Sequence, residues 1–322
     1  MSEPMEICLM FDPHDGLSWE DWRDLAATAE DSGLHGLFCG DHYSGPGGGA
    51  VDALDVWTAL AALAPLTSVL RLGTLVSPLT FRHPSVIARI AVSVDQISGG
   101  RAELGLGTGW NESAHRRAGV PFPPQAVRFA MLDEQLEIIT SSWRAEEFSF
   151  SGEHYVLEGQ QARPLPVHGS LPLILGGSAR RRGAGQAARY ASEYNFALVG
   201  PEPMGPAEFG KGCRRLDAAC EAVGRDPATL KRSIFTWGFV AADPDKADKM
   251  LRRMLELLGD DRDPDAVRAD PGPWIFGSPE EVTEKLAPYR EAGASRLYLK
   301  LVDSGDEAAV HELGEYARAV SA

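Results

Sequence analysis

The stretch EICLMFDPHDGLSWEDWRDLAATAEDSGLHGLFC, residues 6–39, contains the unit from which the rest of the chain is built. Its apolar runs Glu6–Phe11 and His35–Cys39 predict two strands, and the segment between them predicts an amphipathic helix. Ser18 in front of an acidic first turn is a helix N-cap signature, and Gly33 is a helix stop. This order predicts two parallel strands joined by a crossover helix.

The same alternation of strand and helix continues along the chain. Further strands are predicted at Arg71–Val76, Arg101–Gly107, Pro172–Gly176, Tyr194–Val199, Ser233–Val240 and Arg296–Leu301. Helices are predicted after Asp52 and at Pro84–Gln96, Asn111–Ala118, Leu132–Trp143, Ala179–Tyr190, Ala207–Val223, Lys246–Leu258, Pro279–Ala292 and Glu307–Ala319. Eight such units predict an α/β fold, a closed (β/α)8 TIM barrel, as a single domain over residues 1–322. A doubly wound sheet is disfavoured because no G-x-G-x-x-G follows the first strand.

Two segments interrupt this rhythm. Phe148–Phe150 and His154–Leu157 predict a hairpin insertion after the fourth unit. Residues Gly259–Phe276 are rich in proline and aspartate and predict a loop excursion before the last helix and strand. We expect both segments to cover the barrel mouth and to influence specificity.

Composition limits the classes of function. The 322 residues are 44% hydrophobic and 24% charged, as in folded globular proteins. No apolar run is long enough to span a bilayer, and the acidic segment Met1–Glu6 does not resemble a signal peptide, so we expect a cytoplasmic protein. The net charge of −15 disfavours binding to nucleic acids or anionic membranes. The cysteines form no CxxC pair and are expected to be reduced, packed thiols: Cys8, Cys39, Cys213 and Cys220.

The active site of such a barrel lies at the carboxyl ends of its strands. Polar residues and glycines follow five of the predicted strands at this end. They are Asp12, His14 and Asp15; Asp41, His42 and Tyr43; Ser77, Arg82 and His83; Gly107–Glu112; and Gly176–Arg182. We therefore expect these groups to meet at one face of the barrel.

Two glycine-rich turns are candidate ligand sites. Gly176–Ser178 opens a helix and is followed by Arg180–Arg182, which predicts an anion site in an otherwise acidic chain. The alternative is a tight turn with solvated arginines. Gly105, Gly107 and Gly109 allow close approach of either a flat ligand or a neighbouring strand.

His42 is the best candidate for acid–base catalysis. Its neighbour Asp41 can orient the imidazole or raise its pKa, although the pair can also merely shape the loop. His14, His42 and His83 follow neighbouring strands, but none stands in an HxH pair. His83 precedes Pro84 at a helix start, where capping is common. We therefore predict no metal site.

Five motifs, in this order and spacing, resemble the bacterial luciferase-like superfamily. They are FCGDHY at 38–43, LGTLVSP at 72–78, RHP at 82–84, GLGTGWNE at 105–112 and LGGS at 175–178. The chain is most similar to the members that use coenzyme F420, an 8-hydroxy-5-deazaflavin. The resemblance covers nearly the whole chain. It implies a (β/α)8 barrel with an insertion, which agrees with the strand count, and a cofactor ring across the barrel mouth.

The resemblance also implies which residues hold the cofactor. A non-prolyl cis peptide against the ring would correspond to the Leu75–Val76 bond. The anionic phosphate and glutamate tail of F420 would suit Arg180–Arg182, although the same turn would also suit FMN. The residues that the resemblance assigns to the cofactor are Leu75, Val76, Gly107, Thr108, Gly109, Gly176, Gly177, Ser178 and Arg180.

By the same resemblance, His42 handles a substrate proton near the reactive carbon and Asp41 supports it. The sugar-phosphate dehydrogenases of this group carry a glutamate directly after Gly-Thr-Gly. Here Trp110 stands in that place, and Glu112 follows two residues later. This departure implies a bulkier or more apolar substrate, bound between walls that include Trp110, Tyr43 and Glu112.

The expected function is hydride transfer between F420 and a small organic substrate. The alternatives are an FMN-dependent monooxygenase fed by a separate reductase, a metal-dependent barrel hydrolase and a non-catalytic flavin-binding barrel. The resemblance also implies a homodimer and allows for an F420-reducing or flavin-reducing partner enzyme. The small apolar run Ala59–Leu66 is either a dimer interface or an ordinary helix packed on the barrel.

Overall fold

Eight parallel strands close into a barrel in the computed structural model, which describes residues 4–45, 52–200 and 203–321. The barrel strands are β1 (Glu6–Phe11), β2 (Gly36–Cys39), β3 (Arg71–Thr74), β5 (Ala102–Gly107), β8 (Leu173–Gly176), β9 (Glu193–Ala197), β10 (Lys231–Val240) and β12 (Arg296–Leu301). Each pairs in parallel with the next, and β12 pairs with β1. The short strand β4 (Ser77–Pro78) continues from β3 and also pairs with β5. The predicted TIM barrel is confirmed.

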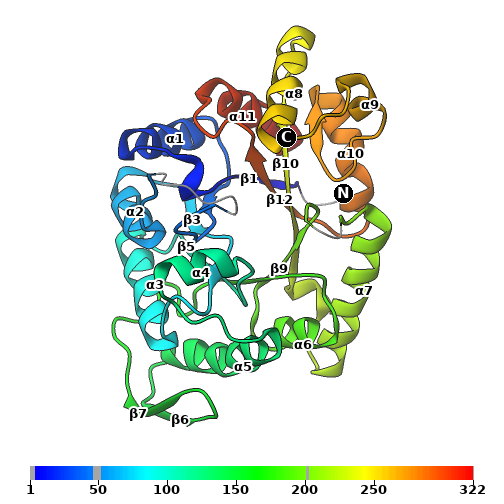
Figure 1. The fold of residues 1–322 in the computed structure, drawn as a ribbon. Helices are drawn as coiled ribbons and strands as arrows, with labels where there is room; N and C mark the ends of the chain where they lie inside the picture. Colours follow the sequence, from blue (N-terminus) through cyan, green and yellow to red (C-terminus); the bar gives the residue numbers. More distant parts are fainter. Residues whose placement is uncertain (1–3, 46–51, 201–202, 322) are drawn as a thin grey trace.

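Helices surround the barrel (Figure 1). They are α1 (Trp19–Asp31), α2 (Val56–Leu63), α3 (Pro84–Ser98), α4 (Glu112–Ala118), α5 (Gln125–Ser142), α6 (Arg181–Tyr190), α7 (Pro206–Ala222), α8 (Pro244–Leu258), α9 (Pro264–Ala269), α10 (Pro279–Glu291) and α11 (Glu307–Ser321). The predicted cap of α1 is confirmed: the Ser18 hydroxyl accepts the Asp21 N–H at 3.2 Å, and the Asp21 carboxylate accepts the Ser18 N–H at 2.7 Å. These bonds satisfy backbone donors that the first helical turn leaves free.

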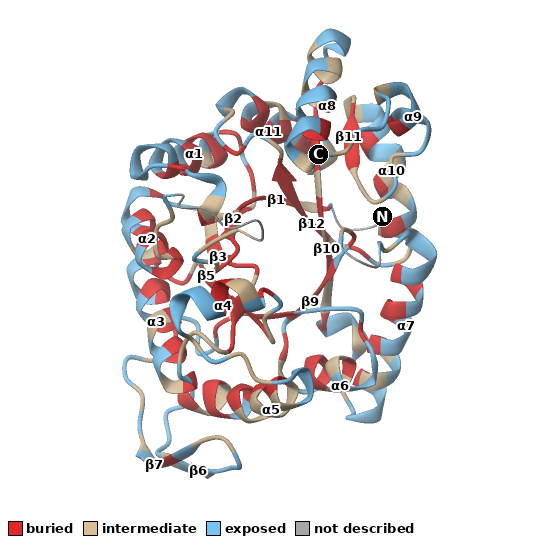
Figure 2. Cartoon of the chain, viewed as in Figure 1, coloured by how far each residue is buried: buried red, intermediate tan, exposed pale blue. Residues whose placement is uncertain are grey.

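The alternation of side chains along each strand divides the core in two. In β1, Leu9 and Phe11 belong to the large buried layer between strands and helices, whereas Cys8 and Met10 belong to a smaller cluster inside the barrel. Figure 2 shows the buried residues along the strands and the inner faces of the helices. Each fully buried large apolar side chain stabilises the fold by about 1.5–3 kcal/mol. All four cysteines are free and buried, as predicted.

The amino ends of the strands carry a buried charged cluster, here called the floor network: Glu6, Glu103, Glu193, Arg296 and Tyr298. The Arg296 guanidinium donates to Glu103 at 2.7 Å, to Glu193 at 2.8 Å and to the Tyr298 hydroxyl at 2.9 Å. It also donates to Glu6, and Tyr298 donates to Glu193. Although burial raises the pKa of Glu103, Arg296 and Arg71 lower it to about 2. Arg296 therefore holds the barrel floor together.

The predicted hairpin is present as β6 (Phe148–Ser151) and β7 (Val156–Gln160). Glu134 of α5 accepts hydrogen bonds from the backbone N–H groups of Glu153, His154 and Tyr155. The hairpin consequently lies beside α5, outside the ring of helices (Figure 1). Its predicted position over the barrel mouth is wrong.

The segment 259–276, predicted as a loop, is partly regular. It contains α9 and the start of β11 (Ile275–Gly277), which pairs in parallel with β10. The Asp263 carboxylate accepts the Asp265 N–H, and Pro264 stands at the first position of α9, so local capping forms this short helix. Arg268 of α9 pairs with Asp248 of α8 at 2.6 Å. The segment thus packs at the outer edge beside α8 (Figure 1), and its predicted position over the mouth is also wrong.

The run Ala59–Leu66 forms most of α2 and the turn that follows it. Within the chain, Ala59, Leu60 and Leu63 are buried, whereas Leu66 is exposed. This burial favours the reading of an ordinary helix packed on the barrel. In the described ranges, no helix combines the length and the apolar character needed to cross a membrane.

Candidate active site at the barrel mouth

Two cations hold the carboxylates at the carboxyl ends of the strands, and the first is Lys300. Near the end of β12, its ammonium donates to Asp12 at 2.6 Å and to Asp15 at 3.0 Å. The Ser304 hydroxyl donates to the other oxygen of Asp15 at 2.7 Å. Burial raises the pKa of Asp12, but Lys300, together with His42 and His14, outweighs this effect and the net pKa is lowered. Asp12 is therefore an anion at neutral pH.

The second cation is Arg82, which holds Asp41. The fully buried Asp41 accepts hydrogen bonds at Oδ2 from Ser77, at 2.7 Å, and from Arg82. Arg82 also donates to Asp55 at 2.7 Å. Burial raises the pKa of Asp41, which the Arg82 charge opposes. The remaining oxygen, Oδ1, is buried and has no hydrogen-bond partner among the residues that the structure describes.

This arrangement corrects the predicted pairing of Asp41 with His42. Among the described residues, no hydrogen bond joins the two side chains, because the Asp41 carboxylate faces Arg82 and Ser77. Adjacent residues project in different directions at the end of a strand. Asp41 therefore cannot orient the imidazole of His42 directly.

His42 lies between two other rings at the mouth. Its imidazole centroid is 5.6 Å from the Trp110 ring, edge to face, and 6.1 Å from the His14 ring. Burial lowers the pKa of His42, and the neighbouring charge of Asp12 opposes this only in part. The imidazole is therefore neutral at pH 7 and can accept a proton.

The other predicted wall residues are placed differently from one another. Trp110 is 62% exposed and stands beside His42, so its free face is open to a ligand. Tyr43 stacks on Phe81, with centroids 4.8 Å apart, and is partly exposed. Glu112 is exposed in the first turn of α4. Of these three, Trp110 is the one in contact with the candidate catalytic histidine.

His83 performs the capping role that its position before Pro84 predicts. Its Nδ1 accepts the backbone N–H of Ser85 and lies 2.7 Å from the Ser85 hydroxyl. Its ring contacts Tyr155 of the hairpin turn at 5.3 Å. The contacts of His83 therefore join α3 to the hairpin.

Two glycines within β5 make room for the end of β3 and for the residues that follow it. The Leu75–Val76 peptide is cis. A Cβ on Gly107 would lie 2.8 Å from the Val76 side chain, and one on Gly105 would overlap the backbone of Thr74. Of the two readings for this motif, the structure thus realises close strand approach at Gly105, whereas Gly107 leaves room for the Val76 side chain. Gly109 has a positive φ of 78°, which favours glycine.

Thr108 is fixed by a residue that the sequence pattern did not mark. Its carbonyl accepts a hydrogen bond from Arg128 of α5 at 3.0 Å. The Arg128 guanidinium lies over the Phe122 ring at 3.8 Å. These contacts anchor the turn between β5 and α4 to α5.

The Gly176–Ser178 turn is exposed at the mouth. One of its N–H groups is already used, because Gly177 donates to the Asn195 carbonyl, and the next residue, Ala179, donates its N–H to the Tyr194 hydroxyl at 3.0 Å. The donors that remain for an anion are those of the first turn of α6. Arg215 of α7 adds positive charge, with Nη1 3.5 Å from the Ser178 carbonyl. Sequence reasoning missed Arg215 because it lies on a different helix.

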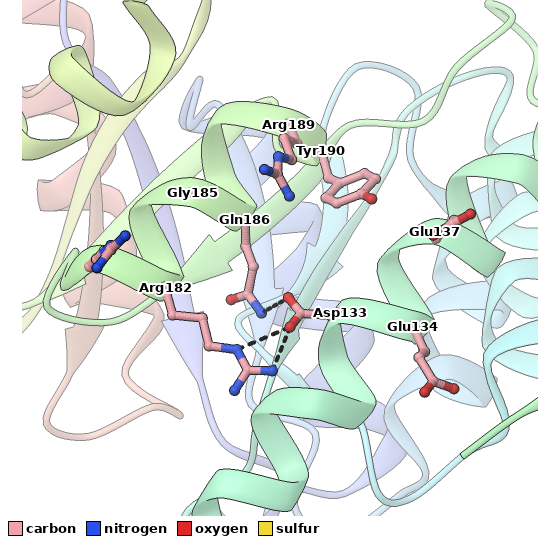
Figure 3. A pocket seen from close by; sticks show the side chains of 9 residues that line it. Asp133, Glu134, Glu137, Arg182, Gly185, Gln186, Arg189 and Tyr190 are labelled. Carbon is pink, nitrogen blue, oxygen red and sulfur yellow. Dashed lines mark hydrogen bonds and ion pairs between the residues drawn. The ribbon is translucent and has the colours of Figure 1, made fainter. Parts of the chain in front are cut away.

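Arg182 does not belong to this turn. It donates to Asp133 of α5 at 2.5 Å, and Gln186 donates to the same carboxylate at 2.6 Å (Figure 3). These side chains line a groove of about 610 Å³ between α5 and α6, formed by the two outer helices and including no strand-end residue. Arg182 is thus paired with α5 in this groove, apart from the Gly176–Ser178 turn, and its predicted role beside Arg180 at a cofactor tail stays a prediction.

Two features of the mouth fit a polar ring with an anionic tail. Asp41 Oδ1 is a buried acceptor for which the described chain provides no donor. The start of α6, next to the exposed Gly176–Ser178 turn, provides donors for a phosphate, and Arg215 adds positive charge. The residues present thus suit a phosphorylated flavin or deazaflavin.

Comparisons with known proteins agree with this geometry. The luciferase-like monooxygenase family matches residues 6–296. The F420-dependent glucose-6-phosphate dehydrogenase of Kineococcus radiotolerans is 36% identical over 298 residues, which cover 85% of each chain. The pyrimidine monooxygenase RutA of Stutzerimonas stutzeri is 33% identical over 175 residues, 53% of this chain and 47% of that protein. The match therefore spans about half the length of this second relative.

A solved structure shares the fold. An F420-dependent secondary alcohol dehydrogenase, in complex with an F420–acetone adduct, superposes with a TM-score of 0.81. The superposition covers 98% of this chain and 99% of that one at 18% identity. At this identity the likeness concerns the barrel architecture.

Proposed function

Because this chain belongs to the luciferase-like monooxygenase family, we propose that it is an F420-dependent oxidoreductase. It transfers a hydride between C5 of the deazaflavin and a small organic substrate. The relative of 36% identity over 85% of the chain, whose name records F420 dependence, supports this choice of cofactor. The phosphate donors around Gly176–Ser178 support it from the structure.

The observation that carries the proposal is the place of His42 at the barrel mouth, between the rings of Trp110 and His14, with a lowered pKa that leaves it neutral at pH 7. In the oxidative direction, a substrate carbinol loses its O–H proton to His42 and its C–H hydride to the cofactor, and a carbonyl forms. In the reductive direction, the protonated His42 returns the proton to the oxygen. A positioned general base of this kind typically contributes about 10²–10⁴-fold to the rate.

When bound, the deazaflavin supplies the hydride acceptor or donor. The chain would hold its phosphate with Gly176, Gly177, Ser178, Arg180 and the start of α6. Arg215, through its contact with the Ser178 carbonyl, adds charge at this point. The cofactor-contact residues proposed near the ring are Leu75, Val76, Gly107, Thr108 and Gly109.

The substrate is expected to be more apolar than a sugar phosphate. Trp110 presents an open aromatic face next to His42. Aromatic faces favour apolar or planar groups through burial and stacking. Trp110, with Tyr43 and Glu112 further out, is therefore proposed to bind the substrate. We also propose that the protein is a homodimer and that a separate enzyme reduces or reoxidises its cofactor.

One observation favours a second candidate function. The 33% identity to a pyrimidine monooxygenase over half of this chain supports an FMN-dependent monooxygenase that is fed by a separate reductase. The same phosphate donors suit FMN, which also carries one phosphate. The two candidates differ in their reaction with oxygen, because reduced flavin reacts with it readily and deazaflavin does not.

The test is equilibrium binding of oxidised F420 and of FMN to the purified protein at two salt concentrations. Tight, salt-sensitive binding of F420 with weak binding of FMN is expected, because the anionic tail meets positive charge. A substrate screen with bound F420 follows, with His42→Ala as the inactive control. Preference for FMN, with oxygen consumption by the reduced complex, would overturn the proposal in favour of the monooxygenase.

A further inference from the structure

We infer that Asp12, held in place by Lys300, is the carboxylate that positions His42 and sets its proton affinity. This inference rests on the proposed function, since it gives His42 a proton to carry. It assigns Asp12 the role that the sequence pattern assigns to Asp41. Asp12 acts through His42 and is a positioning residue.

The first argument is the space around Gly40. A Cβ added to Gly40 would overlap the Asp12 carboxylate at Oδ1 and would lie 3.0 Å from Cδ2 of His42. The Asp12 carboxylate and the His42 ring, which come from adjacent strand ends, therefore both lie next to the space that a side chain at position 40 would need. Glycine at this position lets them come together.

The second argument is how Asp12 itself is held. Lys300 is nine-tenths buried, and its ammonium donates to Asp12 Oδ2 at 2.6 Å. The Asp12 N–H also donates to Asp15 at 3.0 Å, which fixes the turn after β1. Asp12 Oδ2 is thus bound to Lys300. The other oxygen, Oδ1, lies next to Gly40, on the side where His42 also lies. Asp41, in contrast, uses its Oδ2 for Ser77 and Arg82.

The third argument is the set of charges that face His42. They come from the turn after β1, the strand end of β2 and β12: Asp12, His14, Asp41 and Lys300. Of the two carboxylates, Asp12 has the larger effect, and it raises the pKa of His42 against the opposing effect of burial. Loss of the Asp12 charge would also leave Lys300 without one of its two partners. Both changes favour the neutral imidazole.

The experiment measures the pKa of His42 in the full-length protein by NMR titration of its ring signals, without cofactor. The chain has 8 histidines, so the His42 signal is identified by its loss in His42→Gln. Asp12→Asn is expected to lower the pKa of His42. The matched control is Asp15→Asn, which changes the other carboxylate on Lys300 and is expected to shift this pKa less.

A second variant keeps the test independent of the stability of Asp12→Asn. Gly40→Ala retains every charge but displaces the Asp12 carboxylate, and it is expected to move the pKa of His42 in the same direction. In folded Asp12→Asn enzyme, turnover is expected to fall by about 10–100-fold, which is less than in His42→Gln. The acid side of its pH–rate profile is expected to move to lower pH.

An unchanged or raised pKa of His42 in Asp12→Asn would overturn the inference, and so would an equal shift in Asp15→Asn. The proposed function is tested by a different measurement. Failure of the wild-type protein to bind or turn over F420 would reject the cofactor, whereas the titration reports the pairing of Asp12 with His42 in either case.

Discussion

The two ends of the barrel carry charged clusters that differ in how fully their buried polar atoms are hydrogen-bonded. At the floor network, every buried side-chain oxygen and nitrogen has a hydrogen-bond partner. At the mouth, Asp41 Oδ1 and His14 Nδ1 are buried and find no partner within the described parts of the chain. Buried polar groups normally find partners because an unpaired one costs about 1–3 kcal/mol. The floor therefore serves stability, whereas the mouth is the end at which we propose that a ligand binds.

The largest expected effect comes from breaking the floor network. In Arg296→Met, Glu103 and Glu193 lose the cation that both contact in the barrel interior. Removal of one partner from a buried ion pair typically costs about 3–5 kcal/mol. Urea unfolding should show a loss of this size in the free energy of unfolding. A loss below about 1 kcal/mol would mean that the floor does not hold the barrel together.

The next largest effect is expected at the mouth, on turnover and not on stability. His42→Gln should reduce turnover by about 10²–10⁴-fold, because the group that accepts the substrate proton is lost. The free energy of unfolding should change little, since the His42 ring makes no hydrogen bond among the described side chains. Steady-state kinetics and a thermal melt together test this. Full activity in a folded His42→Gln protein would exclude the proposed base.

A smaller, graded effect is expected from pH. Burial lowers the pKa of His42 below its ordinary value of 6.5, so the neutral form is present at pH 7. Alcohol oxidation should hold at neutral pH and decline as the pH falls through this lowered pKa, by about tenfold per pH unit below it. Asp12 stays ionised over this range because its own pKa is lowered. A decline that begins above pH 6.5 would contradict the assignment of this pH dependence to His42.

The smallest effect is expected at an exposed pair. Arg182→Met removes the ion pair with Asp133, in which both side chains are nearly half exposed. Exposed ion pairs contribute about 0–1 kcal/mol. The same urea measurement should therefore show a loss below about 1 kcal/mol, which makes this variant the matched control for Arg296→Met. A salt-sensitive loss of F420 affinity in Arg182→Met would instead show that Arg182 contributes to binding of the cofactor tail.

The sequence predicts the architecture well because periodicity and caps are local. The strand positions, the Ser18 cap of α1, the hairpin strands and the buried cysteines all follow from residues close together in the chain. The short helix α9 was missed because six residues give too little periodicity to separate a helix from a loop.

Within the mouth, adjacency in the sequence predicted which strand ends carry the polar groups and placed His42 among them. It misled for Asp41, which faces Arg82, and it did not reveal that Arg182 faces Asp133 on another helix. Those directions depend on partners that lie tens of residues away. No local pattern records them.

Local patterns in the chain were enough to predict the barrel, the strand ends that carry the polar groups and the likeness to a family whose members use flavins and deazaflavins. Which cation holds which carboxylate could be read only from the folded barrel. Lys300 reaches Asp12 across 288 positions in the chain because β12 pairs with β1 when the barrel closes. A contact of this kind is set by strand register and side-chain packing, and it exists only once the whole sheet has formed.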